Sequence, residues 1–457
     1  MSLFHSQKTD ATTGNLWKSI VLYAIPLIIG TLVQNCFNAV DLVVLGNMAD
    51  SNAVASVGAT SSIIGLVVNS FIGIVGGSKI ILAHQFGAKN SAQIKKTVDT
   101  AMLAAVGIGV LIALLGVPLA PGMLHLTNCP VDCFAGAVIY IRIYIAAAPA
   151  ILLYNFGSAV LTSSGDSQRP LYYIIISGLV NVVLNIVLCL LLPQKVIAVA
   201  VATAASQAVG ALLVIRRLCR MEGDGRLMLR SLQFDMHSFV QIMKQGVPLA
   251  LNSALYPLAN LQIQSAINTF GVSAIAANSA CASLEGVPGA FSASFSSTAT
   301  VFIGQNLGAG DKKRAKRSFH YCLLITCVMG LILGVGMFLT GEFWLSLFIP
   351  GDVEGIQYGM SRMFYVVLFY AVACANGVLA AAIQTHGYAA YTSLCSIFGV
   401  CGFRFIWMTF VYPLFQTFDV LMACFLVSWL LVLASHIIGY FIFCRRSTLS
   451  KTRSAQK

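Results

Sequence analysis

The sequence predicts an all-α integral membrane protein with twelve transmembrane helices in two six-helix bundles. Of the 457 residues, 58% are hydrophobic and only 9% are charged, whereas a soluble domain carries roughly 25% charged residues. The mean hydropathy is +0.86, and apolar stretches long enough to cross a bilayer recur along the whole chain. The second half of the chain also repeats the pattern of the first half.

The individual spans are stretches of about 20 apolar residues between polar breaks. The first is too long for a cleavable signal peptide, and further spans follow it. The expected spans cover residues 17–45, 53–83, 97–120, 134–157, 170–192, 196–215, 241–268, 273–304, 318–341, 356–384, 390–412 and 418–443.

The basic residues are distributed unevenly between the two sides of the expected membrane protein. The formal net charge is +12. With twelve spans, nearly all Lys and Arg of the loops fall on the side that holds both termini, and Lys195 stands alone on the other side. This positive-inside pattern predicts cytoplasmic termini, and we expect a monomer in the plasma (inner) membrane of a prokaryote. Because basic loops contact anionic membrane lipid, the charge does not require nucleic acid as a partner.

The two halves of the sequence repeat one design. The run "AIPLIIGTLVQN" corresponds to "GVPLALNSALYP", which sets Pro26 and Pro248 222 residues apart. We therefore expect an N-lobe of six helices over 1–215, a cytoplasmic connecting loop over 216–237, and a C-lobe of six helices with a basic tail over 238–457. An even number of spans gives both lobes the same orientation, related by a pseudo-two-fold axis along the membrane normal.

This architecture favours a transporter over a channel or an enzyme. Two like bundles around a central cavity rock so that the cavity opens to either side, whereas a channel builds a filter or charged rings. The sequence contains no HExxH, P-loop, GxSxG or Cys–His–acid grouping, so we expect neither enzymatic activity nor a cofactor. The 13 cysteines show no zinc-type spacing. Cys129 and Cys133 share one loop, where a disulfide and two free thiols are both open.

Asp41 is one of the few ionisable residues inside the expected spans. Gln34, Asn38 and Asp41 follow one another at i, i+4 and i+7 and therefore form a polar stripe on one helix face. Such a residue is a functional candidate by default. A place near the membrane interface is the alternative, because Asp41 precedes the polar loop by only six residues.

Later spans supply neutral oxygen atoms for a cation site. Asn181 and Asn185 form an amide pair at i and i+4 on the fifth span, and Thr203 adds a hydroxyl on the sixth. Carboxylate and neutral oxygens together suit a hard monovalent cation such as Na+ rather than a soft metal.

The second half of the chain contains fewer acids and two buried arginine candidates. Glu285 in the eighth span either binds a cationic substrate or a proton, or pairs with an arginine such as Arg404. Arg404 lies deep in the eleventh span, where a guanidinium needs a carboxylate or several carbonyls, so we expect a structural ion pair. Arg142 and Arg362 lie near span ends, where their long side chains extend to the interface.

Several runs of the sequence are specific in combination. In order they are "PLIIGTLVQNCFNAVDLVVLGNMADSNAVASVGA", "GGSKIILAHQFGAKN", "YIRIYIAAAPAILLYNFGSAVLTSSGDSQRPLYY", "NVVLN" and "TATVFIGQNLGAGDKKRAKR". These runs resemble the multidrug and toxic compound extrusion (MATE) family over nearly the whole chain. The resemblance implies a secondary active multidrug efflux antiporter that exports small, often cationic organic compounds in exchange for H+ or Na+ by alternating access. A flippase for a lipid-linked precursor, from the same wider superfamily, is the alternative.

The resemblance also implies a cation site in the first lobe. Its ligands are the acid matching Asp41, the amide matching Asn181, an acid at the position of Asn185 and the hydroxyl matching Thr203. This chain departs from the pattern because Asn185 replaces the acid. We therefore expect weaker Na+ binding, or a proton carried by Asp41 alone.

The second lobe departs from the family pattern as well. The acid expected about eight residues after Pro248 is missing, and Tyr256 stands there. Glu285 is then the carboxylate available to this lobe. Together with Tyr256, Gln34 and Asn38, it is a candidate for binding the substrate or a proton.

Overall fold

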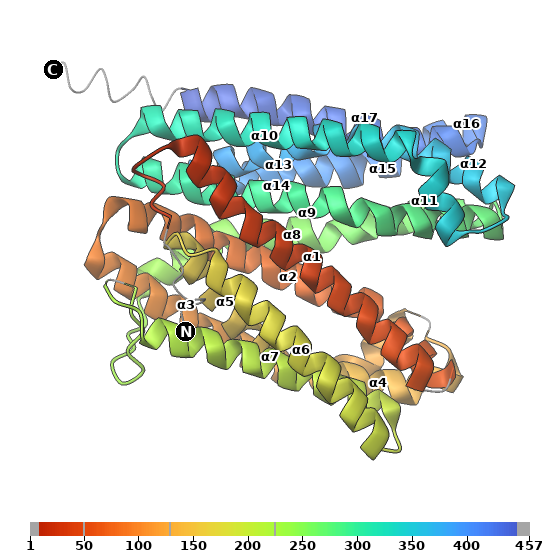
Figure 1. Ribbon diagram of the computed structural model, residues 1–457, viewed down its shortest axis with the longest axis horizontal. Coiled ribbons are helices and arrows are strands. Elements are labelled where there is room, and N and C mark those ends of the chain that lie inside the picture. Colours follow the sequence, from red (N-terminus) through yellow and green to blue (C-terminus); the bar gives the residue numbers. More distant parts are fainter. Residues whose placement is uncertain (1–8, 49–50, 128, 224, 446–457) are drawn as a thin grey trace. The chain divides into compact units, whose positions relative to one another are not determined.

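The computed structural model describes residues 9–48, 51–127, 129–223 and 225–445, and every regular element within these ranges is a helix (Figure 1). In chain order the helices are α1 (Leu16–Met48), α2 (Ser51–Ala88), α3 (Ser91–Leu126), α4 (Val131–Ala146), α5 (Ala148–Ser163), α6 (Gln168–Leu191), α7 (Lys195–Cys219), α8 (Met236–Asn268), α9 (Val272–Gly308), α10 (Lys312–Leu339), α11 (Gly341–Phe348), α12 (Val353–Arg362), the π-helix η1 (Met363–Val367), α13 (Tyr370–Thr385), α14 (Ala389–Ser396), η2 (Ile397–Gly402), α15 (Phe403–Ile406), η3 (Trp407–Val411), α16 (Tyr412–Phe415), α17 (Phe418–Gly439) and η4 (Tyr440–Arg445).

The helices are long and apolar enough for a polytopic membrane protein. Nine helical segments of the described chain pass a length and hydropathy test for spanning a bilayer, and the bent pair α4–α5 makes a tenth. Helices α8 and α9 are 33 and 37 residues long but carry more polar side chains. At 1.5 Å per residue each is about 50 Å long or more, which is ample to cross a bilayer. With these two helices the layout has the twelve spans that the sequence predicts.

The chain divides into two compact units. Unit 1 contains Met1–Asp10 and Ile25–Gly246, and unit 2 contains Ala11–Ala24 and Val247–Lys457. The division falls inside α1, directly before Pro26, which removes one helical hydrogen bond at that point. In unit 2 the first turns of α1 bury Tyr23 completely, edge-on to Phe302 of α9 at 5.4 Å between ring centroids. The expected connecting loop at 216–237 stays a prediction.

The fourth span is bent rather than straight. Helices α4 and α5 meet at Ala147 with a bend of 44°. Pro149 at the start of α5 causes this break, because its ring removes an N–H and clashes with the carbonyl one turn earlier. The neighbouring α3 fits closely against the bend: a Cβ on Gly109 would lie 2.5 Å from the Cα of Pro149.

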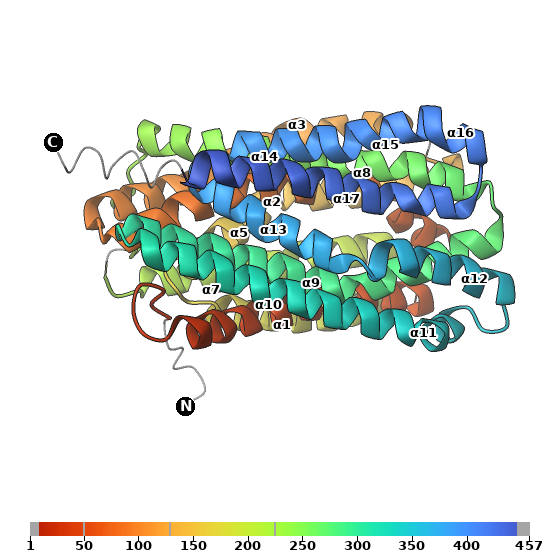
Figure 2. The ribbon, with the colours of Figure 1, turned by 90° about the horizontal axis from the view of Figure 1, so that it is seen from above.

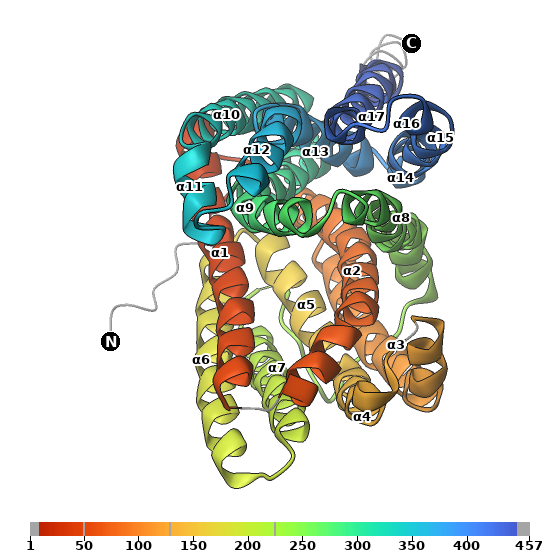
Figure 3. The same ribbon diagram turned by 90° about the vertical axis from the view of Figure 1, so that its right-hand side faces the viewer.

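Unit 1 packs helices α2 to α7 around one apolar core (Figure 3). Helices α6 and α7 lie side by side, and α5 packs against both α3 and α7. The core includes Leu152, Phe156 and Val160 of α5 together with Val214 of α7, all of which are fully buried. This rigid scaffold holds the polar side chains of α6 and α7 in fixed positions.

Unit 2 packs α9, α10 and α13 against one another, with α17 alongside α13 (Figure 2). Three π-helical segments interrupt its spans: η1 follows α12, and η2 and η3 flank the single turn α15. A π turn shifts the angular position of the residues that follow it, and such turns are frequent at functional sites. Two arginines, Arg362 and Arg404, stand directly beside these turns.

The internal repeat appears in matching helix caps. The side chain of Asn90 accepts a hydrogen bond from the N–H of Gln93 at the start of α3. Asp311 accepts one from the N–H of Arg314 at 2.8 Å at the start of α10. Each cap satisfies a donor that the first helical turn leaves without an intrahelical partner.

Candidate functional site

Unit 1 brings together three of the four residues predicted for a cation site. Asn185 donates from Nδ2 to Oδ1 of Asn181 at 3.2 Å, and Asn181 donates to Oγ1 of Thr203 at 3.5 Å. Asn185 is fully buried and Asn181 is 6% exposed. Buried amides remain stable in such a place only when they are hydrogen-bonded. The i, i+4 amide pair on α6 and the hydroxyl on α7 therefore form one connected polar cluster.

Helix α1 runs alongside α6 in a defined register. The position of Gly30 faces Leu171, and the Phe37 ring lies against the Cα of Gly178. Both pairs are 141 residues apart, so the two helices run in the same direction. The same register puts backbone position 41 level with residue 182, between Asn181 and Asn185.

The side chains of Asn38 and Asp41 lie outside the residues that the structure describes. Their backbone belongs to α1, and only the position of this backbone enters the site. The roles of both residues therefore stay predictions.

A cavity of about 190 Å³ adjoins the polar cluster of unit 1. Gln34, Asn181 and Thr203 line it, together with Tyr154 and the buried hydroxyl of Ser177. The Ser177 hydroxyl has no hydrogen-bond partner among the described residues. The cavity therefore offers amide, hydroxyl and aromatic groups to a small ligand, and Gln34 stands where the sequence placed a polar stripe.

In unit 2, Glu285 pairs with Arg362 and not with Arg404, which corrects the expected partner. Arg362 donates from Nε to Oε1 at 2.9 Å and from Nη2 to Oε2 at 3.1 Å. Such a two-pronged contact is the strongest geometry for an arginine and a carboxylate. Arg362 is only 6% exposed, so the expected extension to the interface is wrong. Its position at the end of α12 turns it toward α9, where Glu285 lies.

A chain of amides continues from this ion pair. Arg362 also donates from Nη1 to Oδ1 of Asn278. Asn278 in turn donates to Oε1 of Gln264 at 2.9 Å, and Gln264 donates to Oδ1 of Asn268 at 2.9 Å. Every carbonyl in this chain points back toward the guanidinium. The network fixes the orientation of Arg362 without adding a charge.

Arg404 is fully buried and has no carboxylate partner in the described chain. It donates from Nη1 to Oδ1 of Asn260 at 2.6 Å and from Nε to Oγ of Ser428 at 3.3 Å. The expected structural ion pair is therefore wrong. Neutral acceptors and aromatic faces hold the guanidinium instead: it lies 4.2 Å from the ring centroid of Phe425 and 5.6 Å from that of Tyr256.

The two guanidinium groups of unit 2 are close together. Arg362 lies 5.4 Å and Arg404 4.2 Å from the centroid of the same Phe425 ring, so their centres are within about 10 Å of each other. At an effective dielectric constant of about 20, two like charges at that distance repel by about 1.7 kcal/mol or more. Glu285 offsets one of the two charges, and the other remains.

A cavity of about 360 Å³ lies beside these groups within unit 2. Glu285, Arg362, Tyr256 and Asn260 line it. The remaining lining residues are Ile263, Gln264, Ile267, Asn278, Ala282, Val366, Tyr370, Phe425 and Trp429. Its size falls in the range of pockets that hold small organic ligands. Two of the candidates from the sequence, Glu285 and Tyr256, therefore share one cavity.

Sequence reasoning missed Arg362, Asn278 and Asn260 as members of this site. Arg362 was placed at a span end, and the two asparagines carry no charge that would draw notice. A spacing signal does exist, because Asn278 and Glu285 are seven residues apart and share one face of α9. Their partners on α12 and α15 become visible only in the folded chain.

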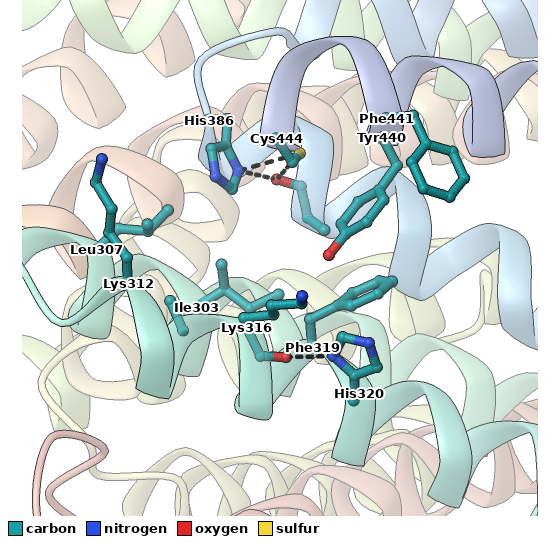
Figure 4. Close-up of a pocket in the computed structure, with 12 residues that line it drawn as sticks. Ile303, Leu307, Lys312, Lys316, Phe319, His320, His386, Tyr440, Phe441 and Cys444 are labelled. Atoms are coloured by element: carbon teal, nitrogen blue, oxygen red, sulfur yellow. Dashed lines mark hydrogen bonds between the residues drawn. The ribbon is translucent and has the colours of Figure 1, made fainter. Parts of the chain in front are cut away.

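A third cavity, of about 260 Å³, lies at another end of unit 2 (Figure 4). Lys312, Lys316 and His320 of α10 lie on one side of it, and His386 and Cys444 lie on the other. His320 donates from Nδ1 to the backbone carbonyl of Lys316 at 2.6 Å. None of the residues predicted for transport lines this cavity.

The cysteines and acids show no metal site within the described residues. Cys129 and Cys133 are free thiols with their Sγ atoms 3.8 Å apart, well beyond the length of a disulfide, about 2.0 Å. Burial raises the pKa of the Cys129 thiol, and its hydrogen bond with Cys133 adds to this shift.

Like bundles of membrane-spanning helices, each enclosing a polar cavity, define a polytopic membrane transporter. The comparison with known families makes this specific. A family model described as MatE matches residues 26–187 and 248–409, and the chain belongs to this family. The two matched segments begin 222 residues apart, so the predicted internal repeat and family resemblance are confirmed.

Curated relatives cover most of the chain. The probable multidrug resistance protein YoeA of Bacillus subtilis is 26% identical over 444 residues, 94% of each chain. The multidrug export protein MepA of Staphylococcus saprophyticus is 21% identical over 73% of this chain and 74% of its own length. An FAD transporter of Shewanella oneidensis is 24% identical over 78% of each chain.

Solved structures share the fold. A MATE protein in complex with MaL6 has a TM-score of 0.87 at 18% identity and covers 98% of this chain and 100% of its own. A MOP superfamily transporter from Pyrococcus furiosus, described by a binding pocket of reverse polarity, has a TM-score of 0.85 at 19% identity and covers 97% and 98%. These likenesses confirm the two-bundle, twelve-helix fold.

Proposed function

We propose that the chain is a secondary active multidrug exporter that exchanges small organic compounds for H+ or Na+ by alternating access. Membership of the MatE family and the names of its relatives, multidrug resistance protein and multidrug export protein, support this function. The FAD transporter among them indicates that relatives also carry large anionic compounds. No observation on the described residues favours the lipid-precursor flippase as a second function.

The coupling ion binds in unit 1. Asn181, Asn185 and Thr203 supply neutral oxygens in one buried cluster, and Asp41 supplies the charge from α1. The observation that carries this proposal is the register of α1 on α6, which puts position 41 level with the amide pair. A site with one carboxylate binds Na+ more weakly than a site with two, because each carboxylate adds to the attraction for the cation.

The membrane potential supplies the energy for such a cycle. One charge that crosses about 100 mV provides roughly 2.3 kcal/mol. Since a tenfold concentration gradient costs about 1.4 kcal/mol, one cation entering against a neutral compound sustains roughly 1.7 decades of accumulation. The protein is expected to work as a monomer in the plasma membrane of a prokaryote, with both termini in the cytoplasm and lipid around it.

Reconstituted vesicles test the proposal. Ethidium export from vesicles that contain the purified chain is measured against an imposed H+ gradient and, separately, an imposed Na+ gradient. Asp41→Asn should abolish gradient-driven export, because it removes the charge that the ion neutralises. Asn185→Asp should increase the affinity for Na+ by about tenfold or more, since it adds a second carboxylate.

Asp132→Asn is the matched control, because Asp132 is an exposed acid at the start of α4 in the same unit. It should export normally. Undiminished gradient-driven export by Asp41→Asn would refute the assignment of the coupling site. Absence of gradient-driven export by the unmodified chain, with several dyes, would refute the exporter function itself.

A further inference from the structure

The cavity of unit 2 has a surplus of positive charge. Of the described residues that line it, Glu285 alone carries a carboxylate, and both oxygens of that carboxylate are bound by Arg362. Arg404 adds a second guanidinium directly behind the wall, in contact with the lining residues Asn260, Tyr256 and Phe425. Two cations against one anion leave a net charge of +1.

The charge of Arg404 is incompletely compensated. Its side chain is fully buried, and Nη2 has no hydrogen-bond partner among the described residues. An isolated charge in a protein interior is strongly unfavourable unless it is paired. Two neutral oxygens and two aromatic faces lower this cost, but neither carries a negative charge. The site therefore gains most from a ligand that brings one.

We propose that this cavity binds the oxyanion, a carboxylate or a phosphate, of an organic compound. Asn260 connects the charge to the cavity. Its Oδ1 accepts from Arg404 at 2.6 Å, which turns its Nδ2 donors to other partners, and the residue itself lines the cavity. An oxyanion bound by Asn260 lies one side chain away from a buried guanidinium. Hydrogen bonds to a charged group are about twice as strong as neutral ones.

The rest of the lining suits the organic part of such a compound. Tyr256, Tyr370, Phe425 and Trp429 line the cavity, and Tyr370 and Trp429 meet edge to face at 5.9 Å. Aromatic walls around a volume of about 360 Å³ accommodate a planar ring system. The preferred ligand is therefore an aromatic compound with one oxyanion group.

A cationic ligand fits the same cavity poorly. It would have to displace Arg362 from Glu285, and breaking a buried pair leaves an uncompensated charge. It would also approach the unpaired charge of Arg404. In a transporter with two cavities, the polar cluster of unit 1 is the better place for a cation, because it carries no positive side chain among its described lining residues.

Flavin mononucleotide and riboflavin test the inference, because they share one ring system and differ by a phosphate. Binding of each to the purified full chain in nanodiscs of zwitterionic lipid is measured by flavin fluorescence. The unmodified chain should prefer flavin mononucleotide by about tenfold or more, the value of a charged hydrogen bond. Arg404→Gln should abolish this preference without weakening riboflavin binding, and Arg404→Lys should restore part of it.

Glu285→Gln gives a second, opposite readout that does not depend on the folding of an Arg404 variant. It frees Arg362 and should increase the preference for flavin mononucleotide. Arg317→Gln is the matched control for loss of one positive charge, because Arg317 is exposed on α10; it should leave the preference unchanged. Competition by inorganic phosphate that depends on Arg404 would support the oxyanion site and identify a free anion as a ligand.

Equal binding of the two flavins, or a preference that Arg404→Gln and Glu285→Gln both leave unchanged, would overturn the inference. So would tighter binding of ethidium than of flavin mononucleotide that Glu285→Gln abolishes. The inference rests on the exporter function only for the origin of the compound. Binding is measured without a gradient, so a lost preference with intact ethidium export refutes the oxyanion site alone.

Discussion

Removing one partner of the Glu285–Arg362 pair should destabilise unit 2 far more than removing both. The side chains are 19% and 8% exposed, and the shortest contact between them is 2.8 Å. Breaking a buried pair costs about 3–5 kcal/mol, because the remaining charge has lost its partner. The residual exposure of Glu285 sets the expected loss for Arg362→Met near the lower end, at about 3 kcal/mol.

The double variant separates this cost from the value of the pair. Glu285→Gln combined with Arg362→Met removes both charges, and neutral replacement of a buried pair costs little. We expect it to be more stable than Arg362→Met alone. Thermal unfolding of the purified chain in nanodiscs, followed by tryptophan fluorescence, gives the values for a double-mutant cycle.

Arg142 provides the matched control for this cycle. It is exposed and makes a single hydrogen bond, from Nε to the backbone carbonyl of Val117 at 3.3 Å. Arg142→Met should change stability by less than about 0.5 kcal/mol. If Arg362→Met is no more destabilising than Arg142→Met, then the pair behaves as an exposed salt bridge, and the reasoning about buried charge in unit 2 is refuted.

Two further predictions concern helix packing and capping, both measured by thermal unfolding. Gly109→Ala should cost about 1–3 kcal/mol, because its Cβ would lie 2.5 Å from the Cα of Pro149, a backbone atom that cannot rotate away. Gly107→Ala has open space and should be neutral or stabilising by up to about 1 kcal/mol; equal stability of the two variants would contradict the packing argument. Asp311→Ala should cost about 1 kcal/mol, because it removes the cap of α10, whereas Asp311→Asn should keep most of it. A full loss in Asp311→Asn would show that charge rather than capping matters.

The spans and the repeat were predictable because they depend on local sequence. A stretch of about 20 apolar residues must be helical in a bilayer, where every backbone group needs an internal partner. The amide pair was predictable for the same reason, since Asn181 and Asn185 at i and i+4 share one helix face whatever surrounds them. A proline inside a span also signals a break, yet the bend at Pro149 was missed because the flanking apolar run continues without interruption.

The sequence by itself determined which segments cross the membrane, how they repeat and which polar residues they carry. The tertiary structure decided which of those residues meet. Glu285 and Arg362 are 77 residues apart, and their contact depends on the rotation of α9 and α12 about their axes, which an apolar pattern around the whole helix does not fix. The π turns beside Arg362 and Arg404 shift that rotation further. Only the folded chain therefore leaves one guanidinium paired and the other without a carboxylate.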